Sequence, residues 1–408
     1  MLTLDNLPPG HRLLVRIDIN TTVENGDVQP NRRFGRHAET LHRLLDDDHA
    51  IACLAHQGRP GGDDFTTLEG HADHLAKTLD HPVEYVPDTH GETAVTTLRG
   101  LDAGEVVLLE NVRTAEDELA DRTPTEHAES ALVQALAPEV DAYMNDAYSA
   151  AHRAQASLVG FPKVLPAYAG PVMTTEYEAN RAVADREFDG PVTMVFGGAK
   201  ATDVIRAMDA LSEKVDSFVL GGIPGELALR ARGHPLGTDL NGTDLFDDQW
   251  AESGADLERV LDAHGDAIRL PVDLAYLDDD RRAEVAVGDV TEKTVAYKDV
   301  GTETLMDYTP VVRDSAAVFV KGSLGVFEDE RFSVGTVGVL ETVADADCFS
   351  VVGGGDTSRA VDLYDLDPDE FDHLSIAGGA YLRALTGDPL PAVEALDRAE
   401  AAGRRLAA

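Results

Sequence analysis

Val351–Val361 reads VVGGGDTSRAV, an apolar run followed by three glycines, an aspartate and small polar residues that open a helical pattern. Glycine weakens the interior of a strand or a helix, so three in succession mark a turn where bare backbone is required. Backbone N–H groups in such a turn, together with the N-terminus of the helix that follows, favour a bound phosphate. The stretch therefore predicts a strand, a phosphate-binding turn and a helix, which together are the unit of an α/β fold.

The same succession of strand, turn and helix recurs along the 408 residues of the chain. Strands are predicted at 11–20, 50–55, 105–110 and 141–146, and again at 192–196, 217–221, 267–273, 317–322, 348–353 and 373–378. Residues 31–45 form a predicted helix with Phe34, Ala38, Leu41 and Leu45 at helical spacing. Alternation over this length predicts an α/β protein of two doubly wound parallel-sheet, Rossmann-like domains joined by a hinge.

A proline- and glycine-containing segment with an acidic helical tail lies between the two halves, at 160–188. We expect an N-terminal domain at 1–170, a connecting helix or hinge at 171–190, and a C-terminal domain at 191–390. Residues 391–408 are predicted to form a C-terminal helix that packs back near the hinge, and the hinge region is expected to begin after Gly160.

The charge is strongly acidic, with 75 Asp and Glu against 34 Lys and Arg, a net charge of −41. Self-repulsion of this size destabilises a compact state, and salt relieves it. The acids are scattered along the chain, which is typical of adaptation to a salt-rich cytoplasm. Nucleic acid and anionic membranes are poor partners for such a surface.

The absence of a recognisable signal sequence and the small number of cysteines also favour the cytoplasm. The N-terminus has no basic region followed by an apolar one, and no apolar run approaches the length of a membrane span. Cys53 and Cys348 each lie in an apolar run, so we expect two buried free thiols rather than a disulfide.

Positive side chains follow the predicted strands of the first half. They are Arg33, His56, Arg59, Arg113, His152 and Arg153. Any one of them alone would be an ordinary surface residue, but ligands of open α/β sheets bind at the carboxyl ends of the strands. The guanidinium group matches carboxylate and phosphate, so the set predicts a pocket for a small anion. Period-two geometry puts Arg16, Asp18 and Asn20 on one face of the first strand, where Asp18 and Asn20 can accept bonds from ligand hydroxyls.

Glycine-rich turns follow the predicted strands of the second half, at 197–203, 221–226, 321–328, 353–359 and 377–383. Five such turns predict a nucleotide site. The chain has no GxxxxGK[ST] motif and no GxGxxG motif with a ribose-binding acid, which disfavours a P-loop enzyme and a dinucleotide fold. Asp356 is predicted to face Mg²⁺ on the phosphates; the alternative, a helix cap, could instead be supplied by Thr357 or Ser358. No zinc-ligand spacing is present.

Taken in order, these motifs resemble the phosphoglycerate kinase family. The matching stretches are RIDIN (16–20), HQGRPGG (56–62), LLENVR (108–113), NDAYSAAHRAQASLVGFP (145–162), FGGAK (196–200), GVFE (325–328), GGGDTS (353–358) and AGGA (377–380). They cover nearly the whole chain. HQGRPG, LLENVR and the acidic composition are most similar to archaeal members, halophilic ones in particular.

The resemblance implies a reversible Mg²⁺-dependent phosphoryl transfer between 1,3-bisphosphoglycerate with ADP and 3-phosphoglycerate with ATP, by a cytoplasmic and monomeric enzyme. It implies that 3-phosphoglycerate is bound in the N-terminal domain by Asp18, Asn20, Arg33, His56, Arg59, Arg113 and Arg153. It implies that the nucleotide is bound in the C-terminal domain by Lys200, Glu328, Gly353, Gly354, Gly355, Asp356 and Thr357, with Glu328 on the ribose and Asp356 on the metal. The catalytic residues implied are Arg33, Lys200, Gly355 and Gly379.

Some positions depart from the family pattern. Bacterial and eukaryotic members carry a second lysine where Val204 stands, NGP where this chain has KGS (321–323), and GGGA where it has AGGA. Thr22 replaces a proline after RIDIN. Lys200, Arg33 and Lys321 are therefore expected to share the cationic role at the transferred phosphoryl group.

The implied mechanism needs no general base, because the carboxylate of 3-phosphoglycerate is already ionised at pH 7. Catalysis is then positioning and charge neutralisation, and the two domains must close on their ligands. The alternatives are a non-catalytic nucleotide- or anion-binding protein of the same fold, and a dehydrogenase, which the missing GxGxxG motif disfavours.

Overall fold

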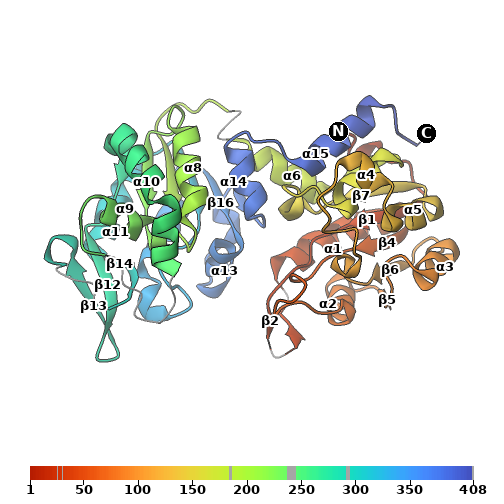
Figure 1. Cartoon of the computed structure of the whole chain (residues 1–408), viewed down its shortest axis with the longest axis horizontal. Helices are drawn as coiled ribbons and strands as arrows, with labels where there is room; N and C mark the ends of the chain where they lie inside the picture. Colours follow the sequence, from red (N-terminus) through yellow and green to blue (C-terminus); the bar gives the residue numbers. More distant parts are fainter. Residues whose placement is uncertain (25, 30, 183–185, 237–244, 291–294, 407–408) are drawn as a thin grey trace. The chain divides into compact units, whose positions relative to one another are not determined.

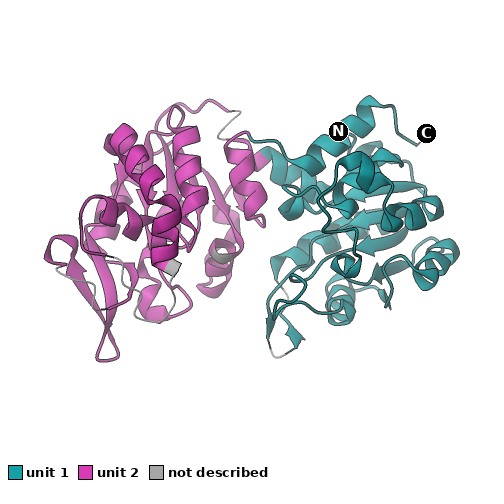
Figure 2. Cartoon of the chain, in the orientation of Figure 1, with its two compact units in different colours: residues 1–178, 388–408 teal, residues 179–387 magenta. Residues whose placement is uncertain are grey.

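The computed structural model of the chain describes residues 1–24, 26–29, 31–182, 186–236, 245–290 and 295–406. The chain divides into two compact units (Figure 2). Unit 1 comprises Met1–Glu178 and Asp388–Ala408, and unit 2 comprises Ala179–Gly387. Residues 171–178 thus pack with unit 1 and residues 179–182 and 186–190 with unit 2, and the hinge role of this segment stays a prediction.

The centre of unit 1 is a six-stranded parallel sheet (Figure 1). Its strands, in chain order, are β1 (Arg12–Arg16), β4 (Ala50–Leu54), β5 (Glu84–Val86), β6 (Val106–Leu109), β7 (Ala142–Asn145) and β8 (Ala167–Ala169). The spatial order is β5-β6-β4-β1-β7-β8. Strands β4, β5 and β6 lie on one side of β1, and β7 and β8 lie on the other. The winding direction therefore changes between β1 and β7.

Helices form two groups around this sheet. They are α1 (Arg32–Asp46), α2 (Glu69–Leu79), α3 (Glu92–Gly100), α4 (Pro124–Ala128), α5 (Ala131–Leu136), α6 (Pro171–Asn180) and α15 (Pro391–Ala401). Helices α1 and α2 contact each other, while α5 contacts α3 and α4, and both α4 and α5 contact the short helical segment η5 (Ala156–Gly160). Alternate strand residues such as Val15 and Cys53 pack with Phe34 and Leu41 of α1. Leu44 rather than Leu45 is fully buried on this face.

The C-terminal helix α15 belongs to unit 1. The amino group of Met1 forms ion pairs with Asp397 at 2.8 Å and Glu400 at 2.9 Å, and Ala392 N donates to Ala151 O at 3.1 Å. The two ends of the chain are therefore held together on the same unit.

Unit 2 is built on a second six-stranded parallel sheet. Its strands are β9 (Val192–Phe196), β10 (Ser217–Leu220), β11 (Ile268–Arg269), β15 (Ala317–Lys321), β16 (Phe349–Gly353) and β17 (His373–Ser375), in the order β11-β10-β9-β15-β16-β17. The winding direction changes between β9 and β15, as in a dinucleotide-binding fold. Two sheets of this kind confirm the predicted fold class.

The helices of unit 2 also form two groups. They are α8 (Ala201–Leu211), α9 (Gly222–Ala231), α10 (Leu245–His264), α11 (Thr302–Arg313), α12 (Val334–Ala344), α13 (Gly355–Leu363) and α14 (Gly379–Leu385). Helix α8 contacts α9, α10 and α14, whereas α12 contacts α11 and α13. Val195, Val318 and Val352 pack with the second group, and period-two geometry directs the intervening Met194, Phe319 and Val351 to the opposite face.

All ten predicted strands are present, but several elements were not predicted. These are β5, β8, the hairpin β2 (Val23–Glu24) with β3 (Asp27–Val28), and an antiparallel sheet of β12 (Asp273–Asp278), β13 (Arg281–Ala286) and β14 (Tyr297–Val300). Strands β2, β3, β5 and β8 have only two or three residues, too few for a periodic signal. The burial pattern of β13 shows no fully buried residue, so its sequence lacks an apolar run.

Both cysteines are free, as predicted, but only Cys53 is fully buried. Cys348 lies at the edge of β16 and is half-buried, which corrects the expectation of two buried thiols. Among the described helices, none is both long and apolar enough to cross a membrane.

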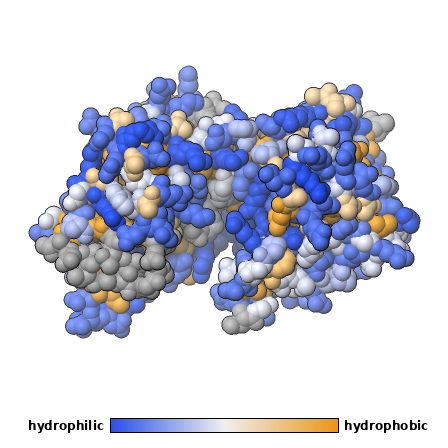
Figure 3. Space-filling view, in the orientation of Figure 1, coloured by the Kyte–Doolittle hydropathy of each residue, from blue (hydrophilic) through white to orange (hydrophobic). Residues whose placement is uncertain are grey.

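The face of the molecule shown in Figure 3 is dominated by hydrophilic residues, with isolated apolar ones between them. Together with the net charge of −41, this composition predicts that unfolding depends on ionic strength. The Debye length falls from about 10 Å at 0.1 M salt to about 3 Å at 1 M, which removes repulsion between neighbouring acids.

We therefore expect the melting temperature to rise as KCl is raised from 0.1 to 1 M, by about 2–4 °C for each kcal/mol of repulsion relieved. Differential scanning calorimetry measures the change. Sucrose at equal osmolality is the control, because it stabilises by exclusion without screening charge. A melting temperature that is independent of KCl would contradict the halophilic interpretation.

Candidate active site

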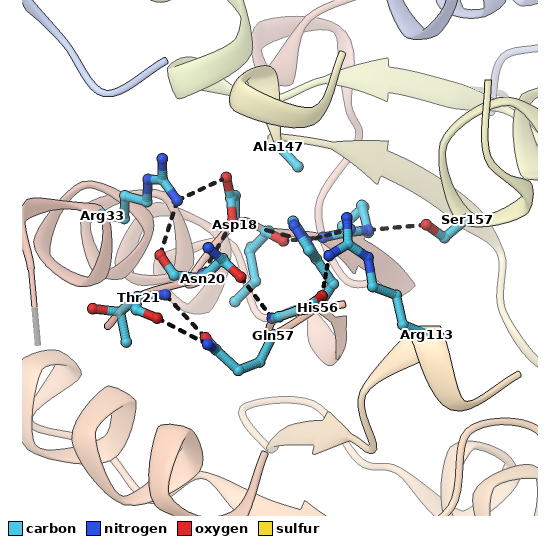
Figure 4. Close-up of polar contacts among 12 residues, drawn as sticks. Asp18, Asn20, Thr21, Arg33, His56, Gln57, Arg113, Ala147 and Ser157 are labelled. Atoms are coloured by element: carbon cyan, nitrogen blue, oxygen red, sulfur yellow. Dashed lines mark hydrogen bonds and ion pairs between the residues drawn. The ribbon is translucent and has the colours of Figure 1, made fainter. Parts of the chain in front are cut away.

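Asp18 lies just beyond the carboxyl end of β1, beside the change of winding direction in the first sheet. Its side chain is 2% exposed. Burial alone would raise the pKa of this carboxyl, but Arg33, His56 and Arg16, with a hydrogen bond from Asn20 N, hold it well below its ordinary value. The Arg33 Nη1–Asp18 Oδ2 distance is 3.4 Å and the His56 Nδ1–Asp18 Oδ1 distance is 3.9 Å (Figure 4). Asp18 is therefore a buried anion among cations.

Asn20 connects two loops of the site. Its side-chain Oδ1 accepts from Gly58 N at 2.9 Å, and its carbonyl accepts from Arg33 Nη1 at 2.8 Å (Figure 4). Gln57 adds a second link, because its amide exchanges hydrogen bonds with the backbone of Thr21 at 2.9 and 2.8 Å. The loop after β1 and the loop after β4 are thus fixed to each other, and α1 presents Arg33 beside them.

A pocket of about 400 Å³ lies next to this cluster, lined by Arg59, Pro60, Arg113, Leu119, Arg153 and Gln155. Burial, together with the neighbouring charges of Arg153 and Arg16, lowers the pKa of Arg113 to about 10. Burial also lowers the pKa of Arg153. Arg113 Nε and Arg153 Nη1 are buried without a hydrogen-bond partner among the described residues. Buried guanidinium N–H groups that lack a protein acceptor are suited to an anionic ligand.

All seven residues predicted to bind the anion thus belong to one unit. Arg33 lies on α1, and the other six follow the carboxyl ends of β1, β4, β6 and β7. Their roles toward a ligand remain predictions. His56 is buried, and the loss of solvation lowers its pKa well below the ordinary value, although Asp18 opposes the shift. A neutral imidazole is therefore expected at pH 7.

In unit 2, the turns after β9, β10 and β15 are bonded to one another at the change of winding direction. Gly198 N donates to Ser323 O at 2.7 Å, and Gly222 N donates to Leu324 O at 3.0 Å. A Cβ at Gly197 would lie 2.1 Å from Ser323 O, and one at Gly322 would lie 2.5 Å from Gly197 O. Glycine is needed here because backbone meets backbone.

The GGGDTS turn after β16 uses its three glycines for three different reasons. A Cβ at Gly353 would lie 2.6 Å from the Tyr381 ring, so this glycine admits an aromatic side chain of α14. Gly354 has φ +108°, which L side chains rarely adopt. Gly355, the first residue of α13, has no atom within 4 Å of its Cβ position. Only Gly355 leaves open space that a ligand could occupy.

Thr357 and Lys321 complete the turn. The Thr357 hydroxyl is buried, accepts from Gly322 N at 3.1 Å and donates to Gly353 O at 3.2 Å, so it ties two turns together. The Lys321 side chain lies 3.4–3.6 Å from the Cβ position of Gly354. Neither Thr357 nor Ser358 caps α13, which corrects that alternative, since the N-cap is Gly354 without a side-chain hydrogen bond.

The remaining predicted residues of unit 2 lie at the same edge of the sheet. Lys200 is exposed and precedes α8, and Glu328 is exposed and 3.6 Å from Arg359 of α13. Gly379 begins α14. The side chain of Asp356 lies outside the described part of the structure, so its role rests on the sequence.

Helices α8, α9 and α13 have no side-chain hydrogen bond at their N-caps, which are Lys200, Gly221 and Gly354. Each follows a strand of the parallel sheet directly. Ala201 N of α8 nevertheless donates to Gln249 Oε1 at 2.6 Å, and Gly222 N and Ile223 N of α9 donate to Leu324 O and Gly198 O at 3.0 Å. Among the described residues, Gly355 N and Thr357 N of α13 make no such bond, so this helix N-terminus is available to an anion at the carboxyl edge, where the helix dipole also favours negative charge.

Sequence reasoning missed three residues of the first site. Arg16 was placed on the same face as Asp18 but given no role, and Glu118 and Ser157 were not considered. The period-two pattern could have marked Arg16. No local signal marks Glu118 or Ser157, because they reach Arg16 only through the tertiary fold.

An arginine-lined pocket in one α/β unit and glycine-rich turns after the strands of a second fit the class of two-domain phosphotransferases. A family-level comparison matches residues 5–388 to "Phosphoglycerate kinase". Phosphoglycerate kinases of Halorubrum lacusprofundi and Haloarcula marismortui are 63% and 60% identical, over 99% and 97% of this chain and 99% of each relative. The crystal structure of phosphoglycerate kinase from Pyrococcus horikoshii has a TM-score of 0.93 at 29% identity, covering 98% of this chain and 100% of that one. The chain belongs to the phosphoglycerate kinase family, and the expected likeness to halophilic archaeal members is confirmed.

The contrast between Gly354 and Gly355 gives a stability prediction. Gly354→Ala forces a strained backbone and should lower the free energy of unfolding by about 1–3 kcal/mol. Gly355→Ala is the matched control, and its free energy of unfolding should stay unchanged or rise by about 0.4–1 kcal/mol. Urea denaturation in molar KCl compares them. Equal stability of the two variants would show that the backbone at Gly354 imposes no constraint.

Proposed function

We propose that this chain transfers a phosphoryl group between ATP and the carboxyl group of 3-phosphoglycerate, in both directions. The observation that carries the assignment is the arginine pocket around the buried Asp18, in a chain that belongs to the phosphoglycerate kinase family. No comparison supports a non-catalytic binding protein of the same fold.

In this proposal unit 1 holds 3-phosphoglycerate. Arg113 and Arg153 neutralise the phosphate, Asp18 and Asn20 orient the hydroxyl, and neutral His56 acts as a hydrogen-bond donor rather than as a base. The acceptor carboxylate is already ionised, so no proton has to be removed from it. Arg33, beside Asp18, stabilises the negative charge of the group in transfer.

Unit 2 holds the nucleotide in the same proposal. The N-terminus of α13, after β16, binds phosphate through backbone N–H groups, and Gly355 leaves the space for its approach. Val204 is buried in α8, so the lysine that other members carry at that position is absent from the site. Lys321, next to Gly354, supplies positive charge with Lys200. Transfer requires the two units to bring their ligands together in line.

Mg²⁺ fits this donor set. No group of three or more His, Cys, Asp or Glu among the described residues could hold a metal, and Mg²⁺ is usually bound by one or two carboxylates plus substrate phosphates. Asp356 would supply the carboxylate. When bound, the ion neutralises charge on the β- and γ-phosphates. We also infer a cytoplasmic enzyme that acts as a monomer.

The test is a steady-state assay with 3-phosphoglycerate, ATP and Mg²⁺ in molar KCl, in which the protein should form ADP. Arg33→Ala should lower kcat by about 10²–10³-fold, the worth of one donor to a developing charge, while 3-phosphoglycerate still binds through the other arginines. Arg43→Ala is the control, because Arg43 lies on the same helix in an exposed ion pair with Asp5. No turnover by the wild-type protein would overturn the function, and a normal kcat in Arg33→Ala would overturn the role of Arg33.

A further inference from the structure

Arg16, the last residue of β1, differs from the other arginines of the site in that all its bonds point inward. It is fully buried. Its Nε donates to Ser157 Oγ at 3.0 Å, its Nη2 lies 2.9 Å from His56 Nδ1, and its Nη1 donates to Ile17 O. Arg113 and Arg153 keep buried N–H groups without a described partner, whereas Arg16 uses each of its three nitrogens on the protein. Because its side chain has no exposed surface, Arg16 is not a direct ligand for the anion.

Glu118 and Ser157 fix the orientation of Arg16. The Glu118 carboxylate is fully buried and accepts from Ser157 N at 2.8 Å and from Ser157 Oγ at 2.7 Å. A guanidinium only donates, so Ser157 Oγ must accept from Arg16 and direct its own hydrogen to Glu118. The buried positive charge of Arg16 is thus connected through one serine to a buried negative charge.

His56 lies at the other end of this series of hydrogen bonds. Because Arg16 has no acceptor, His56 Nδ1 must offer its lone pair, and a neutral imidazole then carries its proton on Nε2. Asp18 Oδ1 favours the opposite arrangement, a proton on Nδ1, but it lies 3.9 Å away, beyond hydrogen-bond distance. Nε2 makes no hydrogen bond with any residue in the described part of the chain, so this N–H can meet a ligand.

We infer that Arg16, Ser157 and Glu118 act as positioning residues that hold His56 as the Nε2–H tautomer, so that its imidazole donates one hydrogen bond to the bound anion. This inference rests on the proposed function only for the identity of the anion. It assigns a task to three buried residues that do not touch substrate.

The charges that face His56 decide how it titrates. They are Asp18 and Arg16 from the first strand and its extension, Arg113 from the segment after β6, and Arg153 from the loop after β7. Loss of solvation and the three arginines all oppose protonation, and only Asp18 favours it. Without Arg16, Asp18 remains as the charge that favours a proton on Nδ1, and neutral His56 should change to the Nδ1–H tautomer.

The direct test is long-range ¹H–¹⁵N correlation NMR of histidine-labelled protein in molar KCl at pH 7.5, with His56 assigned by its absence in His56→Gln. The expected pattern is a protonated Nε2 and an unprotonated Nδ1. The pattern of Nδ1–H or of a doubly protonated ring in the native protein would overturn the inference. This result does not depend on enzymatic activity.

A second test uses the double variant Arg16→Met/Glu118→Gln, which removes one buried charge of each sign. It avoids the uncompensated carboxylate that Arg16→Met alone would leave. Arg12→Met is the matched control, because Arg12 lies on the same strand but bonds to Leu101 O and Glu139 O. Far-UV circular dichroism and melting temperature establish that each variant is folded. If the double variant does not fold, Ser157→Ala takes its place. This variant removes the hydrogen bonds that link Arg16 to Glu118 without removing a charge.

In the double variant, the NMR pattern should change to Nδ1–H, and the Kd of 3-phosphoglycerate at pH 8 should rise about 10–100-fold, the worth of one hydrogen bond to a charged group. Arg12→Met should show neither change.

A double variant that loses affinity but keeps the Nε2–H tautomer would mean that Arg16 only supports the fold, and would overturn the inference. A wild-type protein with the expected tautomer but without phosphoryl transfer would instead overturn the proposed function alone. The two failures are therefore distinguishable.

Discussion

The site in unit 1 depends on one buried negative charge, the carboxylate of Asp18, placed among several cations. Like charges repel strongly where the effective dielectric constant is low, and removing one partner of a buried charge cluster is costly. Asp18 lies within 4 Å of Arg33 and His56 and lowers the electrostatic cost of keeping Arg16 and Arg153 nearby. Arg113 and Arg153 still have buried N–H groups that no residue in the described part of the chain accepts, so the cluster can take a second anion.

The fold places this cluster where the winding direction of the chain changes between two neighbouring parallel strands. In unit 1 that point lies between β1 and β7, and in unit 2 between β9 and β15. The two sheets thus share a topology but bring different chemical groups to their carboxyl edges. Side-chain cations collect at the first sheet, while backbone N–H groups and helix N-termini collect at the second. Salt screens exposed charges far more than buried ones. The acidic surface should therefore respond more strongly to salt than the buried charges of the site do.

Much of this could be predicted from the sequence. Long apolar runs located all ten strands of the prediction, and the carboxyl-edge rule located the cations that surround Asp18. Contacts between distant segments could not be predicted, since Arg16 and Ser157 are 141 positions apart. The glycines show the same limit: Gly353 is required by the Tyr381 ring, which lies on another helix, whereas Gly354 is required by its own φ of +108°. Thr357 fastens two turns instead of capping a helix, because Gly322 N lies within reach of its hydroxyl.

The central claim is that anion binding belongs to unit 1 and nucleotide binding to unit 2. The most direct measurement is calorimetric titration of 3-phosphoglycerate and of ATP, separately, into wild-type protein and Arg153→Met in molar KCl. The account predicts that the variant binds 3-phosphoglycerate about 10–100-fold more weakly, as expected for one lost charge-assisted bond, and binds ATP unchanged. An unchanged affinity for 3-phosphoglycerate, or an equal loss of affinity for ATP, would contradict it.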